Sequence, residues 1–202
     1  MITTEQIKEL RDATGISVMQ CKKALEEAKG DREKALVILR KLGSGAAGKK
    51  GDRTFKAGTV EAYIHATGEV GAIVELDCES DFVSGNDEFK ALARDIAMHV
   101  TATNPKFVKK EDVTEADKKA AKEVFEAEVK SLPAGRQGKP AAMSAKILEG
   151  KLNAYLAEMV LLDQPFIKDQ TTTIKGLLDA ATQKFGEKIA VGRFARFKIL
   201  ER

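Results

Sequence analysis

Three glycines between residues 43 and 48 form the pattern G-x-G-x-x-G, which in some proteins binds the phosphates of a nucleotide. Such a loop needs a strand before it and a helix after it, because the backbone N–H groups must point at the phosphates. Here a helical pattern precedes the glycines, and Lys50 stands where a P-loop has Ser or Thr. We therefore interpret the match as accidental and residues 43–58 as a flexible Gly/Lys linker.

Other side chains that commonly carry out chemistry are sparse. His65 and His99 have no Cys or His neighbour at metal-ligand spacing, and the sequence contains no HExxH, CxxC or GxSxG motif. His99 lies near a predicted helix end, where it is either a partner for the helix dipole or an interface residue. Cys21 and Cys78 lie far apart among apolar neighbours, as buried free thiols do in a reducing compartment. The sequence predicts no enzyme, cofactor or metal.

Acidic residues alternate along the stretch 75–81 as Glu75, Asp77, Glu79 and Asp81. Carboxylates at this spacing lie on one face of a strand, where they either hold a cation or are solvated. A hard cation normally takes its ligands from a loop that can wrap around the ion. We therefore favour a solvated acidic face.

Lys and Arg number 34 against 31 Asp and Glu in 202 residues. This near-balance argues against a nucleic-acid binder, which usually carries a basic stripe. The first residues are polar, unlike a signal peptide, and no apolar run approaches the roughly 18 residues that span a membrane. The sequence predicts a cytoplasmic protein that binds neither nucleic acid nor membrane.

Residues 1–42 predict three short helices that pack as a small bundle. Each helix begins at a Thr, Ser or Asp that can cap it and ends at a glycine: Gly15, Gly30 and Gly43. The second helix carries an inward apolar stripe made of Val18, Cys21, Leu25 and Ala28. Met19 lies beside this stripe, as either an exposed contact for a partner helix or a rim residue of the bundle. So small a core favours a partner-binding module over a catalytic domain.

Residues 59–202 predict an α+β core, in which helices pack on a small antiparallel sheet. A hairpin around Gly68-Glu69 places Val74, Leu76 and Cys78 on the buried face of its second strand. Helical patterns follow over residues 86–103, 114–132, 145–162 and 173–186, and a closing strand is expected within 188–200. The segment "PAGRQGKP" (133–140) predicts a loop.

The stretch "ESDFVSGNDEF" (79–89) places Phe82 and Val83 between the second strand and the next helix. A hydrophobic staple would need its apolar residue next to the helix cap Asn86, and that position is Gly85. Two consecutive apolar residues in a turn cannot both face the core. One of the two is therefore expected to be exposed.

At these residues the chain resembles the bacterial translation elongation factor Ts family. The similar blocks run in order along nearly the whole chain: "LRDATGISVMQCKKALEEAKGDREKAL" (10–36), "VELDCESDFV" (74–83), "DIAMHV" (95–100), "ILEGKLNAYLAE" (147–158), "LLDQPFIKD" (161–169) and "RFARFKI" (193–199). The resemblance implies a three-helix N-terminal module similar to ubiquitin-associated domains, followed by an α+β core.

The resemblance also implies a function without catalytic chemistry, namely guanine-nucleotide exchange on elongation factor Tu, the GTPase that delivers aminoacyl-tRNA. The family's T-D-F-V motif corresponds to Ser80, Asp81, Phe82 and Val83. Phe82 is then the wedge that enters the GTPase beside its Mg²⁺ site, and Asp81 supports it. Family contact positions in the N-terminal module fall on Arg11, Val18 and Met19, and His99 lies in a block near the interface.

Some features depart from the family pattern. Ser80 replaces the usual Thr, Asp77 stands where Asn is common, and "PAGRQG" (133–138) has no usual counterpart. Longer members carry a second half-core with a coiled-coil hairpin, for which we find no counterpart. The resemblance to short members therefore implies a homodimer that restores the full binding surface. The alternative function is a helical adaptor whose N-terminal bundle binds partners without exchange activity.

Overall fold

The computed structural model describes residues 2–130 and 141–201, and their side chains except those of residues 126–130 and 141–147. The N-terminal helices are α1 (Thr4–Thr14), α2 (Val18–Glu27) and α3 (Arg32–Lys49). The core contains β1 (Ala57–Ile64), β2 (Val70–Cys78), α4 (Asp81–Ser84), α5 (Asp87–Thr103), α6 (Glu115–Lys130), α8 (Ala141–Met159), β3 (Pro165–Phe166), β4 (Asp169–Thr173), α9 (Ile174–Phe185) and β5 (Ala190–Lys198). This mixture of helices and antiparallel strands confirms the α+β class.

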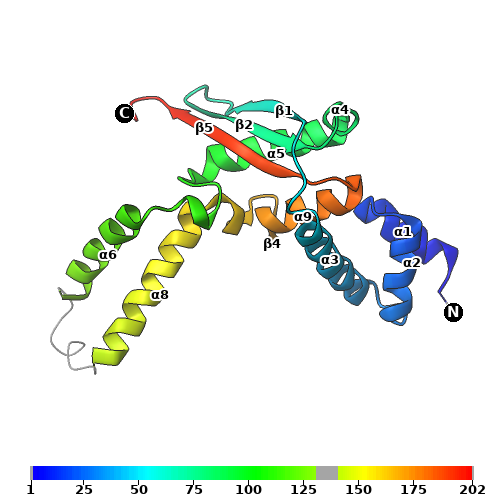
Figure 1. Cartoon of the computed structure of the whole chain (residues 1–202), viewed down its shortest axis with the longest axis horizontal. Helices are drawn as coiled ribbons and strands as arrows, with labels where there is room; N and C mark the ends of the chain where they lie inside the picture. Colours follow the sequence, from blue (N-terminus) through cyan, green and yellow to red (C-terminus); the bar gives the residue numbers. More distant parts are fainter. Residues whose placement is uncertain (1, 131–140, 202) are drawn as a thin grey trace.

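The N-terminal helices pack around a hydrophobic cluster of their own, separate from that of the core (Figure 1). Thr3 caps α1 in a capping box with Gln6, and Gly15 ends the helix in the left-handed conformation, with φ of 66°. Cys21 and Leu25 of α2 are buried, but Val18, which the sequence placed in the same stripe, is 50% exposed. That assignment was wrong because Val18 is the first residue of α2 and lies outside the packed turns.

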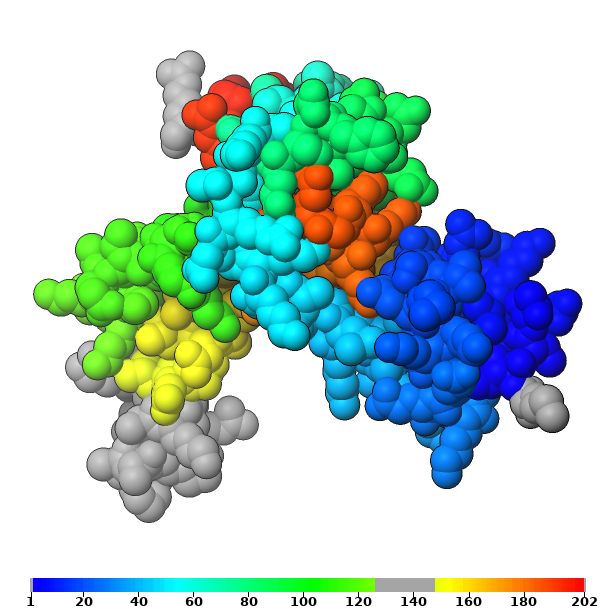
Figure 2. Space-filling view, turned by 45° about the vertical axis from the view of Figure 1, so that its right-hand side comes forward, coloured from blue at the N-terminus to red at the C-terminus, as the bar shows by residue number. Residues whose placement is uncertain are grey.

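The third helix does not end at Gly43, and this corrects the predicted start of the linker at that residue. It continues to Lys49, so the G-x-G-x-x-G residues are helical and form no phosphate loop. Its C-terminal half packs on α9, which Figure 2 shows in orange beside the blue N-terminal helices. Ser44 Oγ donates to Asp179 Oδ2 at 2.7 Å, and Lys50 Nζ donates to the carbonyl of Thr182 at 3.5 Å.

Gly43 is buried where α3 packs against α9, and this predicts a position-specific effect of substitution. A Cβ atom at residue 43 would lie 3.0 Å from Gln183 Oε1 and 3.3 Å from the carbonyl oxygen of Asp179. Gly43→Val is therefore expected to lower the free energy of unfolding by about 1–3 kcal/mol through overpacking. Urea unfolding followed by circular dichroism measures this change.

Gly45→Val is the matched control, because a Cβ atom at residue 45 would have no neighbour within 4 Å. Valine has a slightly higher helix propensity than glycine, so this variant should be as stable as the wild type or slightly more stable. Equal stability of the two variants would contradict the close packing of α3 on α9.

The sheet has the strand order β1-β2-β5 with both pairs antiparallel, and the predicted hairpin is confirmed. Its inner face, with Val74, Leu76 and Cys78 fully buried, packs against α5, which lies beneath the sheet in Figure 1. Phe89 of α5 contacts Phe185 of α9 edge-to-face at 5.9 Å between ring centroids. The short hairpin β3–β4 was not predicted from the sequence.

Helices α6 and α8 lie side by side and extend away from the sheet on the side opposite the N-terminal helices (Figure 1). Phe125 and Tyr155 join them through an edge-to-face contact at 5.6 Å between ring centroids. This pair was predicted as two separate helices and not as a hairpin. The "PAGRQG" segment lies outside the described residues. Among the described helices, none has both the length and the apolar character that a membrane span requires.

Candidate functional site

The candidate site is the single helical turn α4, which follows directly on the buried strand β2. Ser80 caps this turn in an extended conformation, and its Oγ accepts a hydrogen bond from the N–H of Val83 at 3.4 Å. Val83 is 3% exposed and belongs to the core cluster. The turn is thus attached to the core by Val83, and Asp81 at its first position is exposed.

The neighbouring Phe82 has the opposite environment. Its side chain is 85% exposed, which is the largest exposure of any described aromatic residue. The prediction that one of the pair would be exposed is confirmed, and the exposed residue is Phe82, as the family resemblance implied. A large apolar side chain on a turn held by its neighbour is suited to insertion into another molecule.

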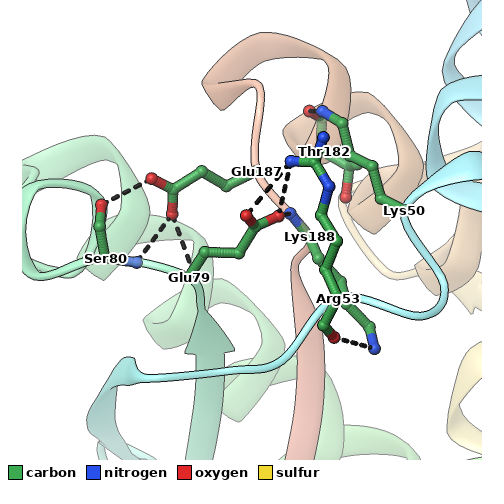
Figure 3. A network of polar contacts seen from close by, with 7 residues as sticks. All are labelled: Lys50, Arg53, Glu79, Ser80, Thr182, Glu187 and Lys188. Carbon is green, nitrogen blue, oxygen red and sulfur yellow. Dashed lines mark hydrogen bonds and ion pairs between the residues drawn. The ribbon is translucent and has the colours of Figure 1, made fainter.

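The segment between α3 and β1 is attached to the strand end that precedes α4 (Figure 3). Arg53 Nη1 lies 3.2 Å from both carboxylate oxygens of Glu79. Lys188 Nζ donates to the carbonyl oxygens of Gly51 at 2.6 Å and Arg53 at 2.8 Å, and it lies 4.4 Å from the ring centroid of Phe55. The backbone N–H of Lys188 and then the Arg53 guanidinium lower the pKa of Glu79.

The N-terminal contact positions implied by the resemblance are all accessible. Met19 is 68% exposed at the start of α2, next to the half-exposed Val18, and Arg11 is exposed on α1. We call these three exposed residues, two apolar and one basic, the N-terminal surface. Helices α1 and α2 lie at the same end of the molecule as α4 (Figure 1).

His99 has no exposed surface, and this corrects its interpretation as an interface residue. Its Nε2 lies 2.8 Å from Gln164 Oε1, and its Nδ1 accepts the backbone N–H of Ile167 at 3.3 Å. An imidazole that accepts at Nδ1 and donates at Nε2 is neutral. Burial lowers the pKa of His99, and the bond to Gln164 opposes that shift in part. The residue therefore has a structural role inside the core.

The buried neutral His99 predicts a loss of stability in mild acid. The unfolded chain binds a proton near the ordinary histidine pKa of about 6.5, and the folded chain binds it only at lower pH. The free energy of unfolding should therefore decrease as pH falls from 7.5 through about 6.5 toward 5. Urea titrations at several pH values measure this slope.

The slope should become shallower in His99→Gln, which removes the titrating ring. His65→Gln is the control, because His65 is exposed at the end of the first hairpin strand. An unchanged slope in His99→Gln, or an equal change in both variants, would assign the pH dependence to other groups.

The remaining candidates from the sequence have structural explanations. Cys21 and Cys78 are free and buried, as predicted. Glu75 pairs with Arg193 on the neighbouring strand, and desolvation followed by repulsion from Glu75 raises the pKa of Asp77. Within residues 2–130 and 141–201, no group of three or more His, Cys, Asp or Glu side chains could hold a metal ion.

The outer face of the sheet was missed by the sequence analysis. It exposes a set of large apolar side chains on three strands and just beyond them: Val60, Ile64, Ile73, Phe197 and Ile199. No other described element covers this face in Figure 1. The alternation along β2 correctly predicted a buried and a solvated face. The solvated face was expected to be acidic, because only positions 75–79 of β2 were considered for it.

Comparison with known proteins identifies the family. The family model of Elongation factor TS matches residues 49–201. Elongation factor Ts of Koribacter versatilis is 48% identical over 198 residues, which cover 98% of this chain and 88% of that protein. Elongation factor Ts of Carboxydothermus hydrogenoformans is 47% identical over 201 residues, which cover 100% of this chain and 90% of that protein.

A more distant relative supports the same assignment over almost its whole length. Elongation factor Ts of Thermodesulfovibrio yellowstonii is 44% identical over 198 residues, which cover 98% of this chain and 96% of that protein. These relatives give no support to the adaptor alternative. The similarity extends far beyond the exposed turn at residues 80–83, and the chain belongs to the bacterial elongation factor Ts family.

Proposed function

We propose that this protein is a guanine-nucleotide exchange factor for elongation factor Tu. It binds the GDP-loaded GTPase, lowers the affinity for GDP and binds the nucleotide-free state most tightly. The observation that carries the proposal is the 85% exposure of Phe82 on a turn whose other apolar residue, Val83, is 3% exposed. Membership of the elongation factor Ts family supports the choice of partner.

In this mechanism the protein acts by binding alone. Phe82 enters the GTPase beside its Mg²⁺ site, and burial of a Phe side chain contributes about 1.5–3 kcal/mol. Asp81, exposed at the first position of α4, supports the displacement with its carboxylate. The N-terminal surface of Arg11, Val18 and Met19 docks on the nucleotide-binding domain. The coupling is reciprocal, so GDP weakens binding of this protein by the factor by which the protein weakens GDP.

The release of a fluorescent GDP analogue from elongation factor Tu tests the proposal. Excess unlabelled GDP is added with increasing concentrations of this protein, and the release rate is followed by stopped-flow fluorescence. We expect the rate to rise with concentration and to saturate. A rate equal to the intrinsic rate at every concentration would overturn the proposed function.

We also propose that two copies of the chain associate through the outer face of the sheet. The face is apolar at Ile73 and Phe197, and it carries both signs of charge in Glu75, Asp77 and Arg193. A two-fold axis through such a face brings apolar area against apolar area and acids near bases of the second copy. A second copy therefore fits this surface.

A further inference from the structure

The position of Phe82 depends on the backbone of the turn that carries it. A side chain that is 85% exposed gains little from packing on its own protein, so it cannot fix its own direction. α4 is four residues long, too short to be stable by its own hydrogen bonds. The contacts that hold the start of this turn therefore determine where Phe82 points.

Glu187 makes most of those contacts, from a loop that is more than 100 residues away along the chain. Its Oε2 accepts the backbone N–H groups of Glu79 and Ser80, each at 3.0 Å, and its Oε1 accepts the hydroxyl of Ser80 at 2.6 Å. Figure 3 shows the carboxylate directed at the strand end immediately before α4. One carboxylate thus satisfies three donors that precede Phe82.

Glu187 is itself held at a fixed place. Gly186 ends α9 in the left-handed conformation with φ of 75°, which directs the chain toward β2. The next residue, Lys188, donates its backbone N–H to Glu79 Oε1 at 2.6 Å. The backbone on both sides of Glu187 is therefore fixed, and hydrogen bonds to a charged acceptor are stronger than neutral ones.

We propose that Glu187 is a positioning residue for nucleotide exchange, which orients the Phe82 turn before the GTPase is met. The inference rests on the proposed exchange function and adds to it a residue outside the family motif at 80–83. When the turn is held in place, Phe82 enters its partner without an ordering cost at that moment. When the carboxylate is lost, the turn has to be ordered during binding.

Glu187→Ala is expected to fold and to slow stimulated GDP release about tenfold, because small misplacements of a positioned group are costly. Glu187→Gln keeps a carbonyl oxygen that accepts both backbone N–H groups, so its loss should be only about two- to threefold. Amide hydrogen exchange at Glu79 and Ser80 should quicken in Glu187→Ala. The control is Glu115→Ala, which removes an exposed ion pair to Lys118 on α6 and should leave both the GDP-release rate and these amide rates as in the wild type.

A double-mutant cycle separates positioning from general stability. If Glu187 acts through Phe82, Glu187→Ala should cost less than about twofold in a Phe82→Ala background. A full tenfold further loss in that background would overturn the inference. A wild-type rate of stimulated GDP release by Glu187→Ala, when the rate of Phe82→Ala is reduced, would also overturn it. If the wild type itself fails to stimulate release, the proposed function falls, and this inference with it.

Discussion

Phe82→Ala is expected to fold like the wild type and to lose about 10- to 100-fold of the stimulated GDP-release rate. The magnitude follows from the roughly 1.5–3 kcal/mol that burial of a Phe side chain contributes, at about 1.4 kcal/mol for each tenfold change. The fold should be unaffected because the side chain is 85% exposed and is absent from the core cluster. Removal of an exposed side chain leaves no cavity.

Stopped-flow release of a fluorescent GDP analogue at several protein concentrations measures the loss, and circular dichroism checks the fold. The neighbouring residue supplies the contrast. Val83→Ala removes a side chain that is 3% exposed, so it should lower the free energy of unfolding by about 1–3 kcal/mol. Well below its unfolding temperature, its stimulation of GDP release should fall less than that of Phe82→Ala, because the Phe82 side chain is retained. Undiminished stimulation by Phe82→Ala would show that the wedge role is wrong.

Phe197→Lys is expected to abolish the proposed homodimer. Phe197 is 68% exposed on the outer face of the sheet, beside Ile73 on the next strand. A two-fold interface through this face would bury two copies of the introduced lysine close together. Charged side chains that are buried without a partner cost several kcal/mol, which is enough to dissociate a modest interface.

Sedimentation equilibrium at micromolar concentration measures the mass of both proteins. The wild type should have twice the chain mass of 21.9 kDa, and the variant should have the chain mass. Val124→Lys is the matched control, because Val124 is 66% exposed but lies on α6. A wild-type monomer at this concentration, or dissociation by the control variant as well, would count against the interface.

Of the three glycines expected to end helices, only Gly15 does so at the predicted residue, as a left-handed cap with φ of 66°. The second helix ends at Glu27, and Lys29, with φ of 54°, is left-handed before Gly30 is reached. Gly43 is glycine for another reason, the absence of a side chain where α3 meets α9. A single sequence does not separate these two uses, because the second depends on a helix more than 100 residues further along the chain.

The exposed turn could be predicted only in part. Spacing alone left Phe82 and Val83 as equal candidates for the core, and the resemblance favoured Phe82 as the exposed residue. What places Val83 inward is the packing of β2 and α5 beneath the turn, which the local sequence does not contain. Periodicity did predict both of these elements, and the N-cap at Asn86, correctly.

Polar pairs distant in sequence could not be predicted at all. His99 bonds to Gln164 across 65 residues, and Glu187 bonds to Ser80 across 107 residues. Such contacts carry no periodicity, and the charged pair Glu187-Lys188 resembles an ordinary solvated loop. This is why His99 was placed at an interface and Glu187 was not considered.

The continuous helix α3 has a consequence for how a partner is engaged. Because α3 runs to Lys49 and packs on α9, the helices that carry the N-terminal surface are packed directly onto the core that carries Phe82. Two contact surfaces held in this way act as a bivalent ligand, in which the first contact gives the second a high effective concentration. Under the proposed function the same linkage works in reverse, since loss of either contact removes that advantage from the other. Binding and departure would then both depend on the packing of one helix.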